Sequence, residues 1–182
     1  MVVGRVLLGL LASRGTMGAP GGAESDRGVP GLLRSLLLPA GTAVVGSAAT
    51  ASSVSTWYPQ LEKPGFSPPS WVFGPVWTAL YAMMGIADHL VAASGAPEQQ
   101  VQTARRTYFA KLALNGLWSV LFFGLRSPAA ALVEIVLLWG AIVATIAAFA
   151  RISRTAALLL VPYLLWTTFA AILNGAIWRL NR

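Results

Sequence analysis

The sequence contains no cysteine, a single histidine and only 10% charged residues over 182 positions. Without cysteine, disulfides, thiolate nucleophiles and cysteine-ligated metal sites are excluded. With one histidine, neither a catalytic triad nor a multi-histidine metal site is expected. Glycine-rich phosphate loops, His-x-x-x-His pairs and Gly-x-Ser-x-Gly elbows are also absent. No metal site and no certain catalytic residue is therefore predicted, and whether the chain is an enzyme stays open.

Apolar residues make up 56% of the chain, and the mean hydropathy is +0.67, which is outside the usual range of soluble domains. The net charge is +7, but the arginines stand singly or in pairs at the ends of apolar runs. A nucleic-acid interface needs a continuous basic face, so no nucleic-acid partner is expected. Basic residues that flank apolar runs indicate a multi-pass protein of the lipid bilayer.

Five apolar segments have about the 20 residues needed to cross a bilayer. They cover approximately residues 32–55, 71–93, 106–125, 128–149 and 156–178. Backbone groups in lipid must bond within their own segment, so these segments are predicted to be helices. The linkers at 126–128 and 151–154 are short enough to make the last three helices antiparallel neighbours. The predicted fold is an all-α bundle of five transmembrane helices over residues 32–182.

Residues 1–31 have a different character. The stretch "MVVGRVLLGLLASRG" is basic, apolar and free of acids, and a run rich in glycine and proline follows it. The apolar part is too short to span a bilayer. We predict a flexible N-terminal extension here, with organelle targeting and a plain disordered tail as the two alternatives.

The stretch "WYPQLEKPGFSPPSWVFGPVW" at residues 57–77 holds three tryptophans and five prolines. Proline fixes φ and lacks an amide donor, so this loop cannot extend either neighbouring helix and should be stiff. Trp57, Trp71 and Trp77 lie toward its ends. We interpret the loop as a lid over one mouth of a cavity, and the alternative is a simple anchor at the membrane interface.

Helical spacing places bulky rings beside small or amide residues on three of the predicted helices. These faces are Trp77, Tyr81 and Met84; Asn115 and Trp118; and Trp166, Ala170, Leu173 and Asn174. Together they predict a cavity for a flat, apolar ligand. The two asparagines could instead hydrogen-bond between helices.

Three further positions carry separate expectations. Trp139 is included among the ligand-binding candidates only because it lies in the middle of its segment. Glu134 is the deepest clear acid, and it is either a functional group or the partner of an arginine. His89 follows Asp88 near a helix end, where a solvated pair and an axial haem ligand are the two interpretations. A seam of small residues at Gly140, Ala144 and Ala148 favours close helix packing.

Several motifs in this order resemble the translocator protein family (TspO/MBR), also called tryptophan-rich sensory proteins or peripheral benzodiazepine receptors. They are "WYPQLEKPGFSPPSWVFGPVWTALY", "LALNGLWSVLFFG", "ALVEIVLL" and "VPYLLWTTFAAILNGAIWRLN", within residues 36–181. The resemblance implies a five-helix bundle, often a homodimer, whose cavity binds porphyrins, sterols and benzodiazepine-site ligands. If the host is eukaryotic, it implies the mitochondrial outer membrane or another organelle membrane, such as the endoplasmic reticulum or Golgi.

By motif, Trp77 and Trp166 look like the family's tryptophans associated with porphyrin binding and light-dependent porphyrin breakdown. The expected ligand-binding set is Phe73, Trp77, Asn115, Trp118, Trp139, Trp166, Ala170 and Leu173. No cofactor is required, and porphyrin or haem is the expected ligand.

One departure from the family weighs against sterols. The cholesterol-recognition pattern of animal members needs a tyrosine near the end of the last helix, where this chain has Gly175 and Ala176. Three functions follow, in this order: transport, sequestration or sensing of a tetrapyrrole; light-dependent degradation of a bound porphyrin; and a scaffold or regulatory subunit.

Overall fold

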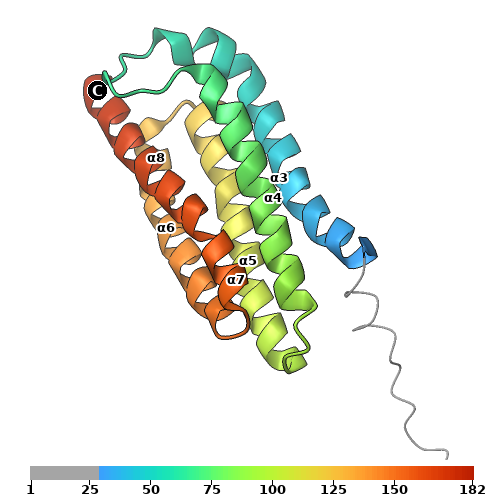
Figure 1. Ribbon diagram of the computed structural model, residues 1–182. Coiled ribbons are helices and arrows are strands. Elements are labelled where there is room, and N and C mark those ends of the chain that lie inside the picture. Colours follow the sequence, from blue (N-terminus) through green and yellow to red (C-terminus); the bar gives the residue numbers. More distant parts are fainter. Residues whose placement is uncertain (1–28) are drawn as a thin grey trace, which may run out of the picture.

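The computed structural model describes residues 29–182, except for the side chains of Leu38 and residues 43–52. Within this range all regular structure is helical, which confirms the predicted all-α class. The helices form an elongated bundle (Figure 1). They are α3 (Val29–Thr56), α4 (Phe73–Ala92), α5 (Glu98–Ser119), α6 (Pro128–Ala150), α7 (Arg154–Leu159) and α8 (Val161–Leu180). Residues 1–28 of the predicted N-terminal extension lie outside the described residues. Its last three positions, 29–31, belong to the first turn of α3.

The predicted number of five membrane spans is not confirmed. Among the described residues, three helical stretches are long and apolar enough to cross a membrane: Ser70–Ala92, Pro128–Ala150 and Arg154–Leu180. The third predicted segment lies in α5, which begins at Glu98 rather than near 106. The residues between the second and third predicted segments are therefore largely helical and do not form a loop up to residue 105. The helix can begin at Glu98 because an acidic side chain in the first turn interacts favourably with the helix dipole. The polar first half of α5 also lowers the hydropathy of that helix.

The fifth predicted segment is broken at Leu160, between α7 and α8. Pro162 has no amide hydrogen, so it cannot donate to the carbonyl four residues earlier. The Leu160 amide instead bonds the Ala157 carbonyl at 3.1 Å, a tighter turn than an α-helix makes. The break changes the helix's neighbours: α7 packs on α4 and α6, and α8 packs mainly on α6.

Gly85 marks the closest approach of α3 to α4. A Cβ atom placed on Gly85 would lie 2.5 Å from Leu36 Cδ2 and 3.1 Å from Leu36 Cα. Real Cβ atoms do not approach neighbours this closely, so only glycine allows the two helices to pack at this distance.

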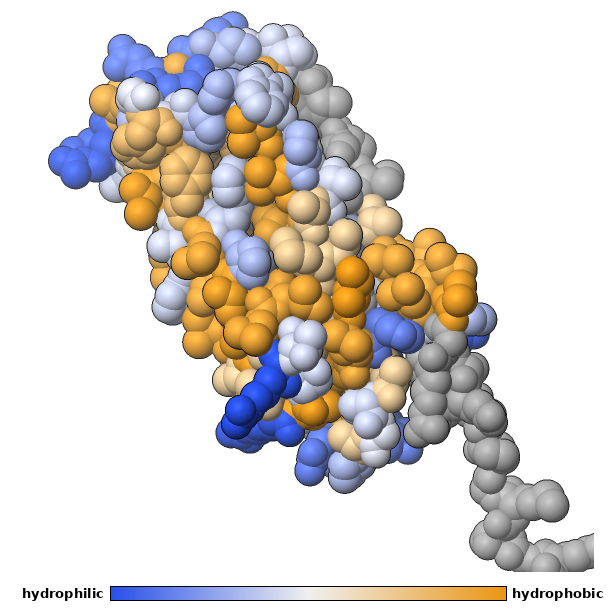
Figure 2. Space-filling view, in the orientation of Figure 1, coloured by the Kyte–Doolittle hydropathy of each residue, from blue (hydrophilic) through white to orange (hydrophobic). Residues whose placement is uncertain are grey.

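The surface has an apolar middle and hydrophilic ends on the face shown in Figure 2. Val133, Val136 and Leu137 of α6 are more than half exposed, as are Leu165 and Ile172 of α8. So many exposed aliphatic side chains suit a surface that contacts lipid.

The buried core divides into two parts. The larger part includes Met84, Tyr108, Phe149 and Tyr163 and fills the end of the bundle near the α6–α7 turn. The smaller part is built around Phe122, Leu173 and Ile177, and residues of the 57–72 loop pack against it.

Candidate functional site

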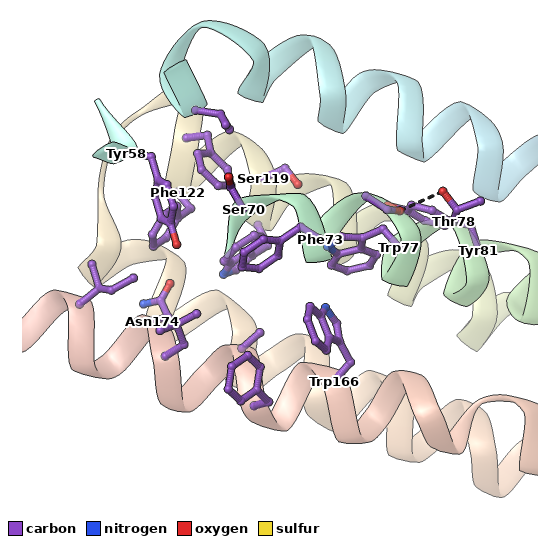
Figure 3. Close-up of a pocket in the computed structure, with 18 residues that line it drawn as sticks. Tyr58, Ser70, Phe73, Trp77, Thr78, Tyr81, Ser119, Phe122, Trp166 and Asn174 are labelled. Carbon is purple, nitrogen blue, oxygen red and sulfur yellow. Dashed lines mark hydrogen bonds between the residues drawn. The ribbon is translucent and has the colours of Figure 1, made fainter. Parts of the chain in front are cut away.

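A cavity of about 410 Å³ lies at the end of the bundle that the 57–72 loop covers. Its volume falls within the range typical of small-molecule sites. Rings from α4, α5 and α8 surround it (Figure 3). The lining includes Phe73, Trp77, Tyr81, Trp118, Phe122, Phe123, Trp166, Phe169, Ala170, Leu173 and Asn174. The cavity is thus mostly aromatic and apolar.

Trp77 of α4 and Trp166 of α8 face each other across the cavity (Figure 3). The Trp166 ring is held edge-to-face by Phe73, with centroids 5.8 Å apart, and it contacts Phe169 at 5.4 Å. Aromatic neighbours of this kind limit the rotation of an indole ring. The two indoles are therefore positioned before any ligand arrives.

The third indole, that of Trp118 on α5, lies flat against Phe122 with centroids 5.1 Å apart and planes at 19°. Phe122 lies in the wider π-type turn Val120–Gly124, which ends this helical segment. Trp118 Nε1 is buried without a hydrogen-bond partner among the described residues. An unpaired buried donor of this kind costs free energy.

A layer of three rings forms the floor of the cavity. Trp77 contacts Tyr81 at 5.4 Å and Tyr163 at 6.1 Å between centroids. The Tyr81 hydroxyl donates to Asn115 Oδ1 at 2.8 Å, which ties α4 to α5. Below this layer the bundle is filled with side chains.

The 57–72 loop closes the other side of the cavity. It contributes Tyr58 and Ser70 to the lining, and Phe66 contacts Phe169 of α8 at 6.4 Å. Partial burial raises the pKa of the Tyr58 hydroxyl. The position of the 57–72 loop over the cavity suits a lid, and a movement of this loop stays a prediction.

Asn181, just after α8, fastens this loop. Its Oδ1 accepts from the Glu62 amide at 3.0 Å, and its Nδ2 donates to the Glu62 carbonyl at 2.9 Å. Lys63 turns inward on the same loop and donates to two carbonyls, those of Pro59 and Leu61. These bonds hold the loop against the end of α8.

The structure brings most of the predicted site residues together. Phe73, Trp77, Trp118, Trp166, Ala170 and Leu173 all line the cavity. Asn115 lies one step behind the lining, where it accepts the Tyr81 hydrogen bond.

Trp139 is a correction. Its side chain is 42% exposed, and its Nε1 donates to Thr168 Oγ1 at 2.9 Å, away from the cavity. Depth along the segment was the only reason to include it, and depth does not say which face of a helix a residue occupies.

At two acidic positions the structure excludes one of the two alternatives. Glu134 is 4% exposed, and neither carboxylate oxygen has a partner among the described residues, so it is not paired with an arginine. Asp88 is fully buried rather than solvated beside His89. It accepts two hydrogen bonds from Arg105, at 2.9 and 3.0 Å. The i, i+4 spacing of Asp88 from the buried Met84 could have indicated that Asp88 faces inward.

The sequence analysis also missed Lys111, which is fully buried.

No metal-binding group is evident: within residues 29–182, three His, Asp or Glu side chains do not converge anywhere. The cavity is therefore built for apolar and aromatic contact, with few polar groups.

The sequence model of the TspO/MBR family matches residues 35–179, which include every residue that lines the cavity. This chain belongs to the TspO/MBR family. It is 48% identical over 136 residues to the tryptophan-rich protein TspO of Chlorobaculum tepidum, covering 75% of this chain and 86% of that protein. It is 45% identical to the protein of the same name from Archaeoglobus fulgidus over 82% of this chain and 96% of that one.

The human translocator protein is 41% identical over 138 residues, which cover 75% of this chain and 82% of the human one. Membership of the TspO/MBR family, together with three apolar helices of spanning length, identifies an integral membrane protein.

Proposed function

We propose that this protein binds a flat, largely apolar aromatic molecule of the porphyrin class, for its transport, sequestration or sensing. One observation carries the proposal: indole rings from three different helices, Trp77, Trp118 and Trp166, line a single cavity. A planar π-system can stack on such rings or meet them edge-on, and each such pair adds about 0.5–1.5 kcal/mol beyond area burial.

Polar contacts at the rim fit the carboxylates of a tetrapyrrole. Lys63 lies in the covering loop, over the Tyr58 ring at 4.9 Å, and Tyr58 itself lines the cavity. A propionate placed beneath this loop would gain a charge-assisted hydrogen bond from the lysine. The rings then provide contact area, and the lysine provides orientation.

Titration of the purified protein with protoporphyrin tests the proposal, with tryptophan emission as the signal. We expect saturable quenching in the wild type. Trp166→Ala should weaken binding by at least about tenfold, since removal of a buried aromatic anchor typically costs 2 kcal/mol or more. Trp139→Ala is the matched control, because that indole lies outside the cavity. Equal affinities for the two variants, or an absence of saturable binding, would contradict the proposal.

Light-dependent degradation of a bound porphyrin is the second candidate function. It is favoured by the contacts of Trp77 with Tyr81 and Tyr163, which place oxidisable rings directly behind a cavity-lining indole. Illumination of the porphyrin complex should then bleach its absorption band, and Trp77→Phe or Trp166→Phe should slow the bleaching. Equal bleaching in wild type and variants would reject this activity.

Further proposals rest on the family resemblance alone. They are a homodimer, a scaffold or regulatory role, a sterol as a weaker second ligand, and an organelle membrane as the location in a eukaryotic host. Chemical crosslinking in bilayers tests the first two, and competition of cholesterol with protoporphyrin tests the third. Microscopy of a tagged chain in its own cells tests the location.

A further inference from the structure

A lysine lies buried directly beneath the floor of the cavity. Lys111 of α5 has no exposed surface, and its Nζ lies 2.7 Å from Met84 Sδ of α4. The same atom lies over two aromatic rings, 4.4 Å from the Tyr108 centroid and 4.8 Å from that of Tyr163. The amino group is thus enclosed by a thioether and two ring faces.

None of these neighbours carries a full negative charge. The ion pair found among the described residues joins Asp88 to Arg105 and does not include Lys111. Ring faces stabilise a desolvated cation by up to about 2 kcal/mol, and a thioether is a weak acceptor. Taking an unpaired charge out of water costs much more than this. A charge on Lys111 therefore persists only with stabilisation from beyond this enclosure, and the nearby Asp88 carboxylate is one source of it.

One layer of rings separates Lys111 from the cavity. Tyr163 has Lys111 over its ring and meets Trp77 edge-on at 6.1 Å. Trp77 lines the cavity, as does Tyr81 beside it. Lys111 thus lies one layer of rings away from the cavity, and an apolar ligand that fills the cavity would lower the effective dielectric constant on that side of the lysine.

Other ionisable groups surround this position, and a proton-binding role must be assigned among them. Facing Lys111 or its neighbours are Asp88 and Tyr81 from α4, Arg105 and Tyr108 from α5, Tyr163 from α8, and Glu134 from α6, which interacts with Tyr163. Asp88 and Arg105 neutralise each other. Lys111 and Glu134 are left as the two unpaired candidates.

We propose that Lys111 couples the cavity to a proton: when an apolar ligand fills the cavity, the Lys111 ammonium releases a proton to solvent and becomes a neutral amine. One N–H bond breaks and its electron pair stays on the nitrogen. Ligand binding is then tighter at higher pH. This inference rests on the proposed porphyrin-binding function.

The test uses protoporphyrin dimethyl ester, which has no titratable carboxyl group, so that any proton exchanged above pH 7 comes from the protein. Binding is measured by calorimetry in two buffers of different ionisation enthalpy over a range of pH. In the wild type we expect release of up to one proton per site and an affinity that rises by up to about tenfold per pH unit. Lys111→Met should abolish the release and flatten the pH profile.

Two variants serve as comparisons. Arg106→Gln removes an exposed cation from the same helix and should keep the wild-type profile. Glu134→Gln should also keep it, and loss of proton release in Glu134→Gln alone would reassign the role to Glu134 and overturn the proposal.

Binding of the ester to the wild type without proton exchange would overturn the proposal without any variant, and so would equal proton release in Lys111→Met or, if that variant misfolds, in Lys111→Gln. A complete lack of binding of the ester and of free protoporphyrin would instead reject the proposed function.

Discussion

The two ends of this bundle share the helices α4 and α5 and yet have opposite interiors. Toward the 57–72 loop, α4 and α8 enclose a cavity lined by indole and phenyl rings. Toward the α6–α7 turn, α4, α5, α6 and α7 meet in a filled core, where Tyr108 stacks on Phe149 at 5.7 Å. The hollow end has no buried charge in its lining, and the filled end holds Asp88, Arg105 and Lys111.

The difference shows how one bundle separates stability from binding. The Asp88–Arg105 ion pair and stacked rings at the filled end fix the helices in place, and this support allows a void at the other end. Voids cost free energy in proportion to their volume, so a cavity persists only where the surrounding elements are held from outside it. Substitutions at the filled end should therefore change stability, and substitutions at the hollow end should change binding.

The largest expected effect is at the filled end. Asp88→Ala leaves the Arg105 guanidinium without its buried partner, and loss of one member of a buried pair costs about 3 kcal/mol or more. We expect a free energy of unfolding in detergent lower by about this amount. Glu62→Ala, at an exposed acid of the 57–72 loop, is the control and should change it by less than about 0.5 kcal/mol. Similar small losses in both variants would show that the buried pair does not support the fold.

Gly85→Ala comes next, because its Cβ would overlap the Leu36 side chain and crowd its backbone. Overpacking of this kind costs about 1–3 kcal/mol. The control is Gly140→Ala, where nothing lies within 4 Å of the new Cβ. That variant should be neutral or more stable, by up to about 1 kcal/mol from helix propensity. Thermal unfolding of the two proteins should shift in opposite directions, and a shared shift would contradict the close α3–α4 contact.

At the hollow end, Ala170→Phe should fill part of the cavity. Porphyrin affinity should fall at least about tenfold, or 1.4 kcal/mol, with stability unchanged or raised. Ala144→Phe adds the same ring on an exposed face of α6 and should bind as the wild type does. Undiminished binding by Ala170→Phe would place the ligand outside this cavity.

The smallest effect is expected at the loop. Asn181→Ala removes the two bonds to the Glu62 backbone, each worth about 0.5–1.5 kcal/mol. Hydrogen exchange of the amides over residues 61–72 should accelerate by roughly fivefold, with little change in the helices. Arg179→Ala, an exposed neighbour, should leave the exchange unchanged. Exchange that stays slow in Asn181→Ala would show that other contacts hold the loop.

Much of the hollow end could be predicted from sequence, because periodicity reports which residues share a face. Trp77 and Tyr81, four positions apart, and Trp166, Ala170 and Leu173 do lie along single faces toward the cavity. Trp139 lies outside the cavity and is partly exposed. Its inclusion among the candidates did not use periodicity, because no other candidate residue lay at helical spacing from it.

The filled end was harder to predict. Hydropathy assigns a lysine or an aspartate to the ends of spans, so it gave no inward signal for Lys111, and for Asp88 only the i, i+4 spacing from Met84 pointed inward. Lys111 is buried against Met84 and Tyr163, and Asp88 is paired with Arg105, in each case from another helix. The spacing of residues along one helix does not predict such contacts between helices. The start of α5 was not predicted because the apolar segments were used to place the helices, and the first turns of α5 are polar.

The interruption at Leu160 has a consequence for how such bundles diversify. Pro162 lies between α7, which packs on α4, and the part of α8 that lines the cavity, so the break separates a stretch in the filled core from a stretch that faces the void. A proline one turn later would extend the solid portion and shorten the chamber, and one turn earlier would do the reverse. The position of a single proline could in this way adapt the cavity of related chains to ligands of different length, with the lining residues unchanged.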